Sequence, residues 1–380
     1  MKENFISKII VNSPGNIGSL EIPLSGEERK HLIITGKNGS GKTTLLSEMT
    51  DFFRISQKMP DYNEVIKEYT NRDIDIYFSN KYTEQLSELI KSGNFVVAAF
   101  KPHRNTEDIN TTGSIAQWQG QKHTDINEGA NRGFVQYLIN LRARQAFARE
   151  EGDTEQADKI KDWFGKFENR LKYIFEDDNL KLSFDTRKLT FNIIPGKGMP
   201  FDLKTLSNGF SSIFSIVSEL LMRMENLNST HYDVEGIAII DEIDTHLHVD
   251  LQKKILPFLI DFFPKIQFIV TTHSPFIVSS ISNAVVCDLN KKIVTEDLSG
   301  YSYDVLIESF FGAKLISRKI EDMISDYDTL NLLAEKSPEQ NEEFATIKKY
   351  LLNLPKYMPN ELSLKIKEIE LSDLNNTYLA

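Results

Sequence analysis

A glycine-rich stretch near the N-terminus has the residue types and spacing that bind a triphosphate. Residues 36–43 read GKNGSGKT and fit the pattern G-x-x-x-x-G-K-[ST]. Glycines let the backbone turn tightly so that several N–H groups meet at phosphate oxygens. The helix expected after the loop directs its N-terminal dipole at the same charge. We therefore predict that ATP is bound by Asn38, Gly39, Ser40, Gly41, Lys42, Thr43 and Thr44.

A second group of polar residues follows an apolar run and has the chemistry to complete this site. The segment 237–248 reads IAIIDEIDTHLH, so two acids stand at the end of an expected buried strand. A parallel strand delivers its last residues to the ligand edge of the sheet. We predict that Lys42 contacts the β- and γ-phosphates and that Thr43 and Asp241 hold Mg²⁺ or its waters. Glu242 would orient and deprotonate the attacking water.

The turn after these acids is crowded with further polar side chains. Asp244, His246 and His248 could form a metal site of the His-x-His plus carboxylate kind. A loop that faces a second subunit explains the same residues equally well. Both interpretations stay open at this point.

Composition narrows the classes of protein and of ligand. The chain has 380 residues, of which 40% are hydrophobic and 26% charged, as in ordinary globular proteins. It contains no apolar run of the roughly 18–20 residues needed to cross a bilayer and no signal-peptide pattern at the N-terminus. A single cysteine, Cys287, excludes an internal disulfide framework. We expect a cytoplasmic protein without a membrane partner, with Cys287 as a buried small hydrophobe.

The formal net charge of −11 limits contact with nucleic acid to a local patch. The best candidates for such a patch are four arginines on one predicted helical pair, Arg132, Arg142, Arg144 and Arg149. A solvated helix face is the alternative, because Glu150 and Glu151 follow directly.

Alternating and helical patterns indicate an α/β protein with a helical insertion. We expect mostly helix over 51–93, two helices over 130–176 separated near 150–154, and helix from about 300 onward. A helix should begin near 207–210. The expected strands cover 5–11, 19–24, 31–36, 94–100, a hairpin within 180–193, 236–240 and 267–271.

These elements suggest four segments. Residues 1–125 form the first part of the nucleotide-binding domain, and 126–177 form a helical-pair insertion. Residues 178–298 form the second part of the domain, and 299–380 form a helical C-terminal region.

The order of four motifs, GKNGSGKTT, LSNGF, IAIIDEID and VTTHS, resembles the ABC ATPase superfamily. Within it the chain is similar to the soluble SMC-like and OLD-like branch rather than to transporter subunits. This resemblance implies an ABC-type P-loop NTPase with a mixed central sheet and N-terminal antiparallel strands. It also implies a homodimer or higher homo-oligomer that closes around Mg-ATP.

The resemblance assigns further site residues. LSNGF corresponds to the signature motif, so Ser207 and Gly209 would bind the γ-phosphate of ATP held by the opposite subunit. His273 corresponds to the switch histidine at the γ-phosphate and is catalytic with Glu242 and Lys42. The glutamine that senses Mg²⁺ and water in this family corresponds to one of Gln117, Gln119 and Gln121.

The chain departs from the family pattern at several positions. Asn208 and Phe210 replace the usual Gly and Gln of the signature motif, and Ile243 replaces the proline found after the catalytic Glu in transporter subunits. The D-loop aspartate corresponds to His248 or to Asp250.

Three further stretches, DEIDTHLHVDLQ, THSPFIV and GYSYDVLIESFFG, resemble ATPases of bacterial anti-phage systems of the Septu (PtuA-like) and PARIS (AriA-like) types. Such ATPases work with a separate protein effector, often a nuclease. The segment after Pro275 lacks the acidic cluster of a Toprim nuclease, so we expect no nuclease in this chain. We expect an ATPase that acts as a sensor or regulatory scaffold. The alternatives are an SMC-like ATPase of DNA repair or chromosome maintenance, a transporter subunit, and a non-hydrolysing scaffold.

Overall fold

The computed structural model divides the chain into two compact units, Met1–Tyr301 and Ser302–Ala380. The structure describes residues 3–12, 17–58, 73–80, 86–104, 126, 131–203, 206–224, 234–333, 335–355 and 358–378.

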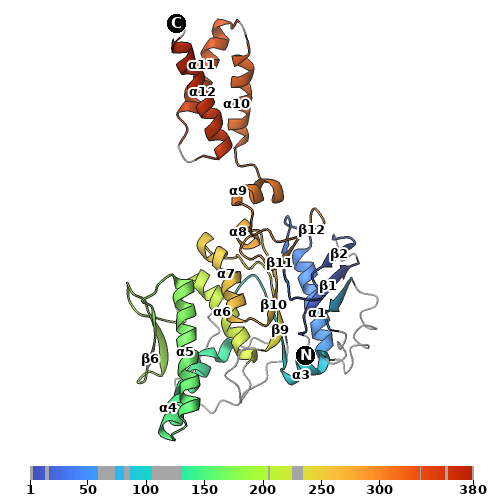
Figure 1. Cartoon of the computed structure of the whole chain (residues 1–380), viewed down its shortest axis with the longest axis vertical. Helices are drawn as coiled ribbons and strands as arrows, with labels where there is room; N and C mark the ends of the chain where they lie inside the picture. Colours follow the sequence, from blue (N-terminus) through green and yellow to red (C-terminus); the bar gives the residue numbers. More distant parts are fainter. Residues whose placement is uncertain are drawn as a thin grey trace. The chain divides into compact units, whose positions relative to one another are not determined.

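A six-stranded sheet lies at the centre of the first unit (Figure 1). Its strand order is β12-β11-β3-β10-β9-β5; all neighbours are parallel except the antiparallel β12 at one end. The strands are β3 (His31–Thr35), β5 (Phe95–Phe100), β9 (Glu235–Ile240), β10 (Ile266–Thr271), β11 (Ala284–Asp288) and β12 (Ile293–Glu296). Every residue of β3, β10 and β11 is buried, as expected for parallel strands covered on both faces. Cys287 on β11 is buried as predicted, and burial raises the pKa of its thiol to about 12.

A second sheet, which is antiparallel and formed by the N-terminal part of the chain, packs near the central sheet. It contains β1 (Ile6–Val11), β2 (Leu20–Pro23) and β4 (Ile74–Phe78), in the order β2-β1-β4. Helices α1 (Lys42–Lys58) and α3 (Leu86–Ser92) share one apolar core with strands of both sheets. Buried Gln267 links the sheets: its amide oxygen accepts from Ile6 N–H at 2.7 Å and its amide nitrogen donates to Ile6 O at 3.0 Å.

The mixed α/β architecture with N-terminal antiparallel strands is as predicted, but the expectation of mostly helix over 51–93 is wrong for β4. The cause is a two-residue period in IDIYF. Ile74 and Ile76 are buried, whereas Tyr77 is 45% exposed. That alternation suits a strand with one covered face, and β4 pairs with β1 through Ile9 and Ile76.

The predicted helical pair is η2 (Asn131–Gly133), α4 (Phe134–Glu150) and α5 (Thr154–Phe175). Asp153 caps α5 by accepting from Gln156 N–H at 3.0 Å, which explains why the second helix begins there. Aromatic contacts join the two helices, such as the edge-on contact of Tyr137 on α4 with Trp163 on α5 at 6.2 Å between ring centroids. A three-stranded antiparallel sheet follows, with β6 (Lys181–Asp185), β7 (Thr190–Ile194) and β8 (Phe201–Asp202).

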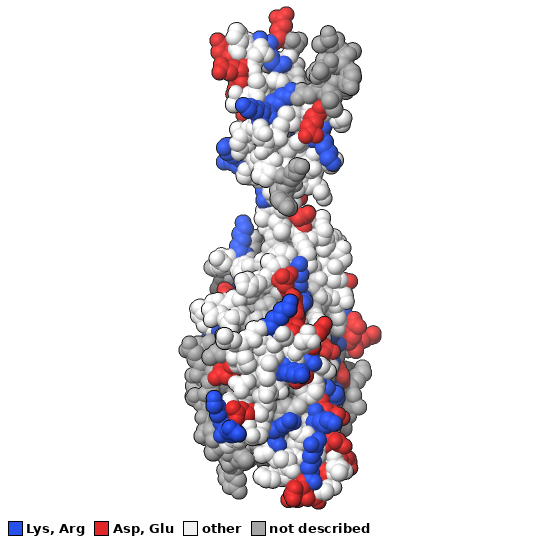
Figure 2. Space-filling view, turned by 90° about the vertical axis from the view of Figure 1, so that its left-hand side faces the viewer, with Lys and Arg blue, Asp and Glu red and all other residues white. Residues whose placement is uncertain are grey.

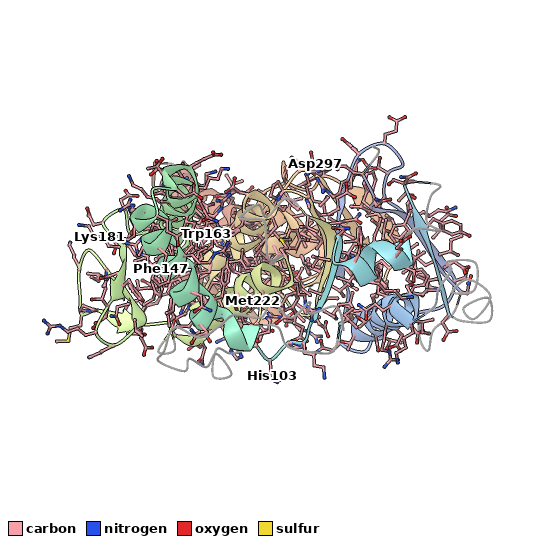
Figure 3. All side chains as sticks on the ribbon, turned by 90° about the horizontal axis from the view of Figure 1, so that it is seen from below. His103, Phe147, Trp163, Lys181, Met222 and Asp297 are labelled. Atoms are coloured by element: carbon pink, nitrogen blue, oxygen red, sulfur yellow. The ribbon has the colours of Figure 1, made fainter. Side chains whose placement is uncertain are left out.

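Helix α6 (Asn208–Met224) precedes β9, α7 (Val249–Phe262) connects β9 to β10, and α8 (Pro275–Val278) connects β10 to β11. Viewed from below, the insertion with Phe147 and Trp163 lies on one side of the sheet, and α1 and α3 lie on the other (Figure 3). No helix in the described part of the chain combines the length and apolar character that a bilayer crossing needs.

The second unit is helical, as the sequence predicts. It contains α9 (Tyr303–Val305), η3 (Leu306–Phe310), α10 (Arg318–Asn331), α11 (Pro338–Leu352) and α12 (Asn360–Tyr378). Ser337 and Gln340 form a capping box that begins α11. The last three helices share a small core of Tyr327, Leu330, Ile347, Leu351 and Ile369.

Candidate functional site

The glycine-rich loop leaves β3 and leads directly into α1. Gly36, Gly39 and Gly41 have φ values of 143°, 81° and 96°, in the region that favours glycine. A Cβ at Gly41 would also lie 2.4 Å from Ile17 Cγ1, so a side chain is excluded there. The first N–H groups of α1 have no partner within the helix, which leaves donors for an anion.

Lys42 folds back into this loop. Its Nζ donates to the carbonyls of Gly36 at 2.9 Å and Lys37 at 3.2 Å, and the residue is buried. Burial lowers the pKa of Lys42, and the charges of Glu242 and Asp241 oppose that effect. Ser40 Oγ is buried without a hydrogen-bond partner among the described residues. These unsatisfied donors and the buried cation fit a triphosphate.

Asp241 joins three elements of the site. Its Oδ2 accepts from Thr43 Oγ1 at 2.9 Å, and its Oδ1 accepts from Thr271 Oγ1 at 2.5 Å. A hydroxyl and a carboxylate in contact suit Mg²⁺, which takes few protein oxygens and keeps waters and phosphate oxygens as its other ligands. The chemistry of Thr43 and Asp241 therefore fits the predicted metal role.

Glu242 is held in an uncommon backbone conformation directly after β9. Its φ is 45°, which is costly for a residue with a side chain and recurs at functional sites. Its N–H donates to Thr271 Oγ1 at 2.7 Å, and its Oε2 accepts from Thr245 Oγ1 at 3.2 Å. Thr271 therefore positions both acids, Asp241 and Glu242.

His273 follows β10 between two anchored neighbours. Thr272 Oγ1 donates to Asp244 Oδ1 at 2.6 Å, and Ser274 Oγ donates to Gln252 Oε1 at 2.7 Å. Burial of part of its surroundings lowers the pKa of His273, and repulsion from the Lys42 charge lowers this pKa further. At pH 7 the imidazole is therefore mainly neutral, and it has one donor and one acceptor nitrogen.

The alternative metal site on the following turn is not supported. Asp244 accepts from Thr272, and the His246 ring lies 6.3 Å from the His103 ring. Across the residues that the structure describes, no group of three or more His, Cys, Asp or Glu side chains could hold a metal ion.

Arg104 is part of the site, although the motifs do not predict it. The residue follows β5 and is 7% exposed. Its guanidinium donates to the carbonyl of Asp241 at 2.7 Å, the carbonyl of Glu242 at 2.9 Å and Ser212 Oγ at 3.0 Å. Burial lowers its pKa to about 10, so it stays charged at pH 7. One cation therefore ties the acidic strand end to helix α6. An arginine shortly after a predicted core strand is the only sequence signal for it.

The candidate glutamines, Gln117, Gln119 and Gln121, lie outside the described residues.

The signature segment begins α6, away from the phosphate loop. Ser207 and Asn208 are exposed, and Ser207 O accepts the helical hydrogen bond from Ser211 N–H at 2.8 Å. A Cβ at Gly209 would lie 3.0 Å from the His246 carbonyl oxygen, so glycine permits close packing there. Phe210 stacks on Phe175 at 3.9 Å between ring centroids, which explains why an aromatic residue replaces the usual Gln.

The geometry brings Lys42, Thr43, Asp241, Glu242 and His273 to one edge of the sheet. Ser207 and Gly209 stand at the start of α6, and this helix packs on β5 at the end of the sheet, three strands from β3.

Residues 32–279 match the family described as "AAA domain, putative AbiEii toxin, Type IV TA system". The chain belongs to this family.

Three individual proteins are similar to the chain at low sequence identity. It is 25% identical to the Septu protein PtuA of Bacillus thuringiensis, over 95% of this chain and 96% of that protein. It is 26% identical to the PtuA of Bacillus mycoides, over 95% of this chain but 49% of that protein, so it spans about half of that relative. The "Retron Vc95 probable ATPase" of Vibrio cholerae is 32% identical over 31% of this chain and 23% of that protein.

Two solved structures also resemble this chain at low identity. An Smc head bound to the C-terminal winged-helix domain of ScpA is 11% identical, with a TM-score of 0.43 over 77% of this chain and 96% of the other. A nucleotide-free ATP-binding cassette of an ABC transporter is 15% identical, with a TM-score of 0.38 over 78% and 93%. The resemblance to the Septu protein PtuA is confirmed, and the resemblance to PARIS ATPases stays a prediction.

We predict that Arg104→Lys lowers kcat for ATP hydrolysis at least about tenfold and leaves KM within about threefold, because a lysine cannot reproduce the guanidinium fork that orients the two acids. Steady-state kinetics measure kcat and KM, and thermal unfolding shows whether the variant is folded. Lys101→Ala, at an exposed cation of the same segment, is the control.

Ser212→Ala removes one of the four hydrogen bonds of Arg104 and should give a smaller loss of kcat, which keeps the test informative if Arg104→Lys does not fold. An unchanged kcat in folded Arg104→Lys protein would show that Arg104 does not position the acids.

Proposed function

We propose that this chain binds and hydrolyses ATP with Mg²⁺, forms a dimer around the nucleotide and regulates a separate effector in anti-phage defence. The observation that carries the ATPase part is the hydrogen-bonded set of Thr43, Asp241 and Thr271 at the mouth of the phosphate loop. Family membership and the Septu and retron relatives support the wider assignment.

In this proposal the chain's residues act in sequence on the bound triphosphate. The N-terminus of α1 and Lys42 bind the phosphates, and bound Mg²⁺ would supply charge neutralisation at Thr43 and Asp241. Glu242 takes a proton from the attacking water, and Thr271 and Arg104 keep its backbone in place. Neutral His273 contacts the γ-phosphate.

The position of the signature segment favours a composite site. Ser207 is exposed at the start of α6, and this helix packs on β5, three strands from the strand that leads into the phosphate loop. An exposed helix N-terminus is suited to an anion that arrives from outside the subunit. We infer that Ser207 and Gly209 contact the nucleotide held by a second copy.

We expect Lys42→Ala to abolish ATP binding, because the buried cation of the loop is lost. Glu242→Gln should bind ATP, lose at least about a hundredfold in kcat, as expected for a missing general base, and stay dimeric in Mg-ATP. Light scattering after gel filtration and phosphate release test both variants, with exposed Glu155→Gln as the control. Retained turnover in Glu242→Gln would remove the base role and would favour another source of water activation.

Mixing two inactive variants tests the composite site directly. Lys42→Ala and Ser207→Arg each lack activity alone, but a mixed dimer keeps one site with an intact loop and an intact signature. Random pairing should restore about a quarter of the wild-type rate. If no activity returns although mixed dimers are shown by tag exchange, Ser207 acts within its own subunit.

The effector part is tested by capture from the native cells. Tagged Glu242→Gln protein in Mg-ATP should retain a nuclease or toxin-like protein, because it holds the closed state. Tagged Lys42→Ala protein is the matched control and should retain less. Recovery of DNA with repair factors and no effector would favour the alternative of an SMC-like ATPase in DNA repair or chromosome maintenance.

A further inference from the structure

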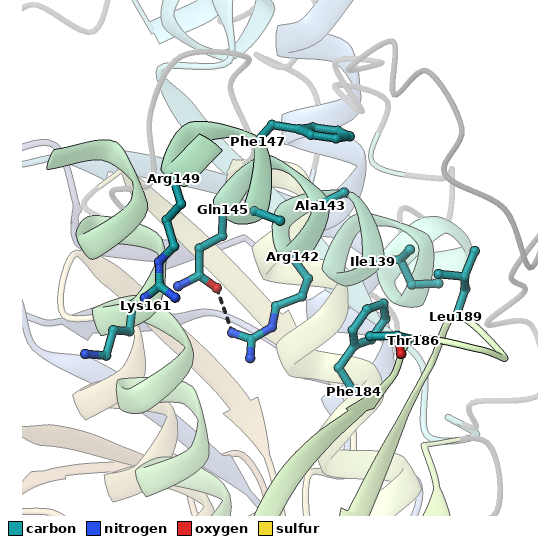
Figure 4. A pocket seen from close by; sticks show the side chains of 11 residues that line it. Ile139, Arg142, Ala143, Gln145, Phe147, Arg149, Lys161, Phe184, Thr186 and Leu189 are labelled. Atoms are coloured by element: carbon teal, nitrogen blue, oxygen red, sulfur yellow. Dashed lines mark hydrogen bonds between the residues drawn. The ribbon is translucent and has the colours of Figure 1, made fainter. Parts of the chain in front are cut away.

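A groove of about 740 Å³ crosses the helical insertion, far from the phosphate loop in the sequence. Helix α4 provides its floor, Lys161 of α5 one side, and the β6–β7 hairpin the other side (Figure 4). We call it the basic groove. Its volume falls in the range of about 300–1,000 Å³ typical of small-molecule sites.

The two sides of the basic groove differ in chemistry. At about 100° per residue, Arg142 and Arg149 fall on one side of Ala146 on α4, whereas Ala143 and Phe147 fall on the other. Figure 4 shows Arg149 and Lys161 on one side, Phe184 and Leu189 on the other, and Arg142 between them. The floor residues Ala143 and Ala146 are small, which leaves space above the helix.

The cationic side has no internal partner. In the described chain, the side chains of Arg149 and Lys161 form no hydrogen bond or ion pair, and no acidic residue lines the groove. Burial lowers the pKa of Arg142, and repulsion from Arg149 lowers it further. Three neighbouring like charges without a counter-charge favour an anion.

Arg142 is already oriented for such a ligand. It donates to Gln145 Oε1 at 2.7 Å, and its guanidinium carbon lies 5.2 Å from the centroid of the Phe164 ring. An ordered guanidinium binds phosphate oxygens in two parallel bonds with less loss of side-chain entropy.

The apolar side presents flat rings. Phe184 of the hairpin contacts Phe191 at 4.9 Å between centroids. Phe147 is 57% exposed but lies on the other side of α4 from Phe184 (Figure 4). Aromatic faces stack on nucleobases without sequence preference. The space-filling view of this side of the molecule shows acidic and basic residues mixed over much of the surface, so the three cations form a local feature and not a broad basic stripe (Figure 2).

We propose that the basic groove binds a nucleotide unit, with its phosphate at Arg142, Arg149 and Lys161 and its base against the phenylalanine side. The unit comes either from a free mononucleotide or from a single strand of nucleic acid. This site is distinct from the ATP site and does not depend on the proposed dimer.

The test is fluorescence anisotropy on the full chain without ATP or Mg²⁺, with a labelled oligothymidylate, and competition by dTMP. Arg149→Glu and Lys161→Glu should each weaken binding at least tenfold, and Phe184→Ala about tenfold. Arg144→Glu, an exposed arginine of α4 outside the groove, is the matched control and should change binding less than twofold. For Arg149→Ala the slope of log K against log salt should fall by about 0.7, the value for one single-strand phosphate contact.

The outcomes separate the sources and the alternatives. Tight binding of the oligomer with weak competition by dTMP supports a nucleic-acid strand, and equal affinity supports a free nucleotide. The proposal is overturned if neither probe binds, if Arg144→Glu weakens binding as much as Arg149→Glu, or if Lys42→Ala abolishes binding and so places the probe at the phosphate loop. Binding of an acidic peptide alone would also overturn it.

Discussion

The carboxylate of Asp241 receives hydroxyl hydrogen bonds from two different elements, Thr43 at the start of α1 and Thr271 at the end of β10. An acid at the end of a buried strand is costly unless its oxygens are satisfied, and these two donors satisfy both. The arrangement requires β9 and β3 to flank β10 in one parallel sheet, as they do. The hydrogen bonds that satisfy the Asp241 carboxylate therefore link the strand order, the phosphate loop and the end of β10.

Arg104 extends this link from the strand end to helix α6. A buried guanidinium has five donors, and here the partners are the backbone carbonyls of Asp241, Glu242 and Lys101 and the hydroxyl of Ser212 on α6. Movement of α6 relative to β9 would leave a buried charge with fewer partners, which costs several kcal/mol. We therefore expect the two acids and helix α6 to move together. This coupling through Arg104 does not require a glutamine.

Much of the fold and of the candidate site was predictable from the sequence where a local residue pattern determines the structure. The apolar runs around His31–Thr35 and Glu235–Ile240 form buried strands, and the loop glycines adopt the expected backbone. Prediction failed for Ile74–Phe78, since five residues of alternation are weak beside a polar, helix-like surrounding. It also missed Arg104, because the carbonyls of Asp241 and Glu242 that it contacts are more than a hundred residues away and carry no side-chain signature. The position of Ser207 relative to a second subunit cannot be read from one chain.

The stack of Phe210 on Phe175 has a consequence for communication in the proposed dimer. Phe175 ends α5 of the insertion, and Phe210 stands next to the glycine that would meet the neighbour's triphosphate. The insertion of one subunit would therefore respond to the nucleotide held by the other subunit and not to its own. With a single ATP bound, the two insertions would differ, and the subunit with the empty loop would carry the altered one.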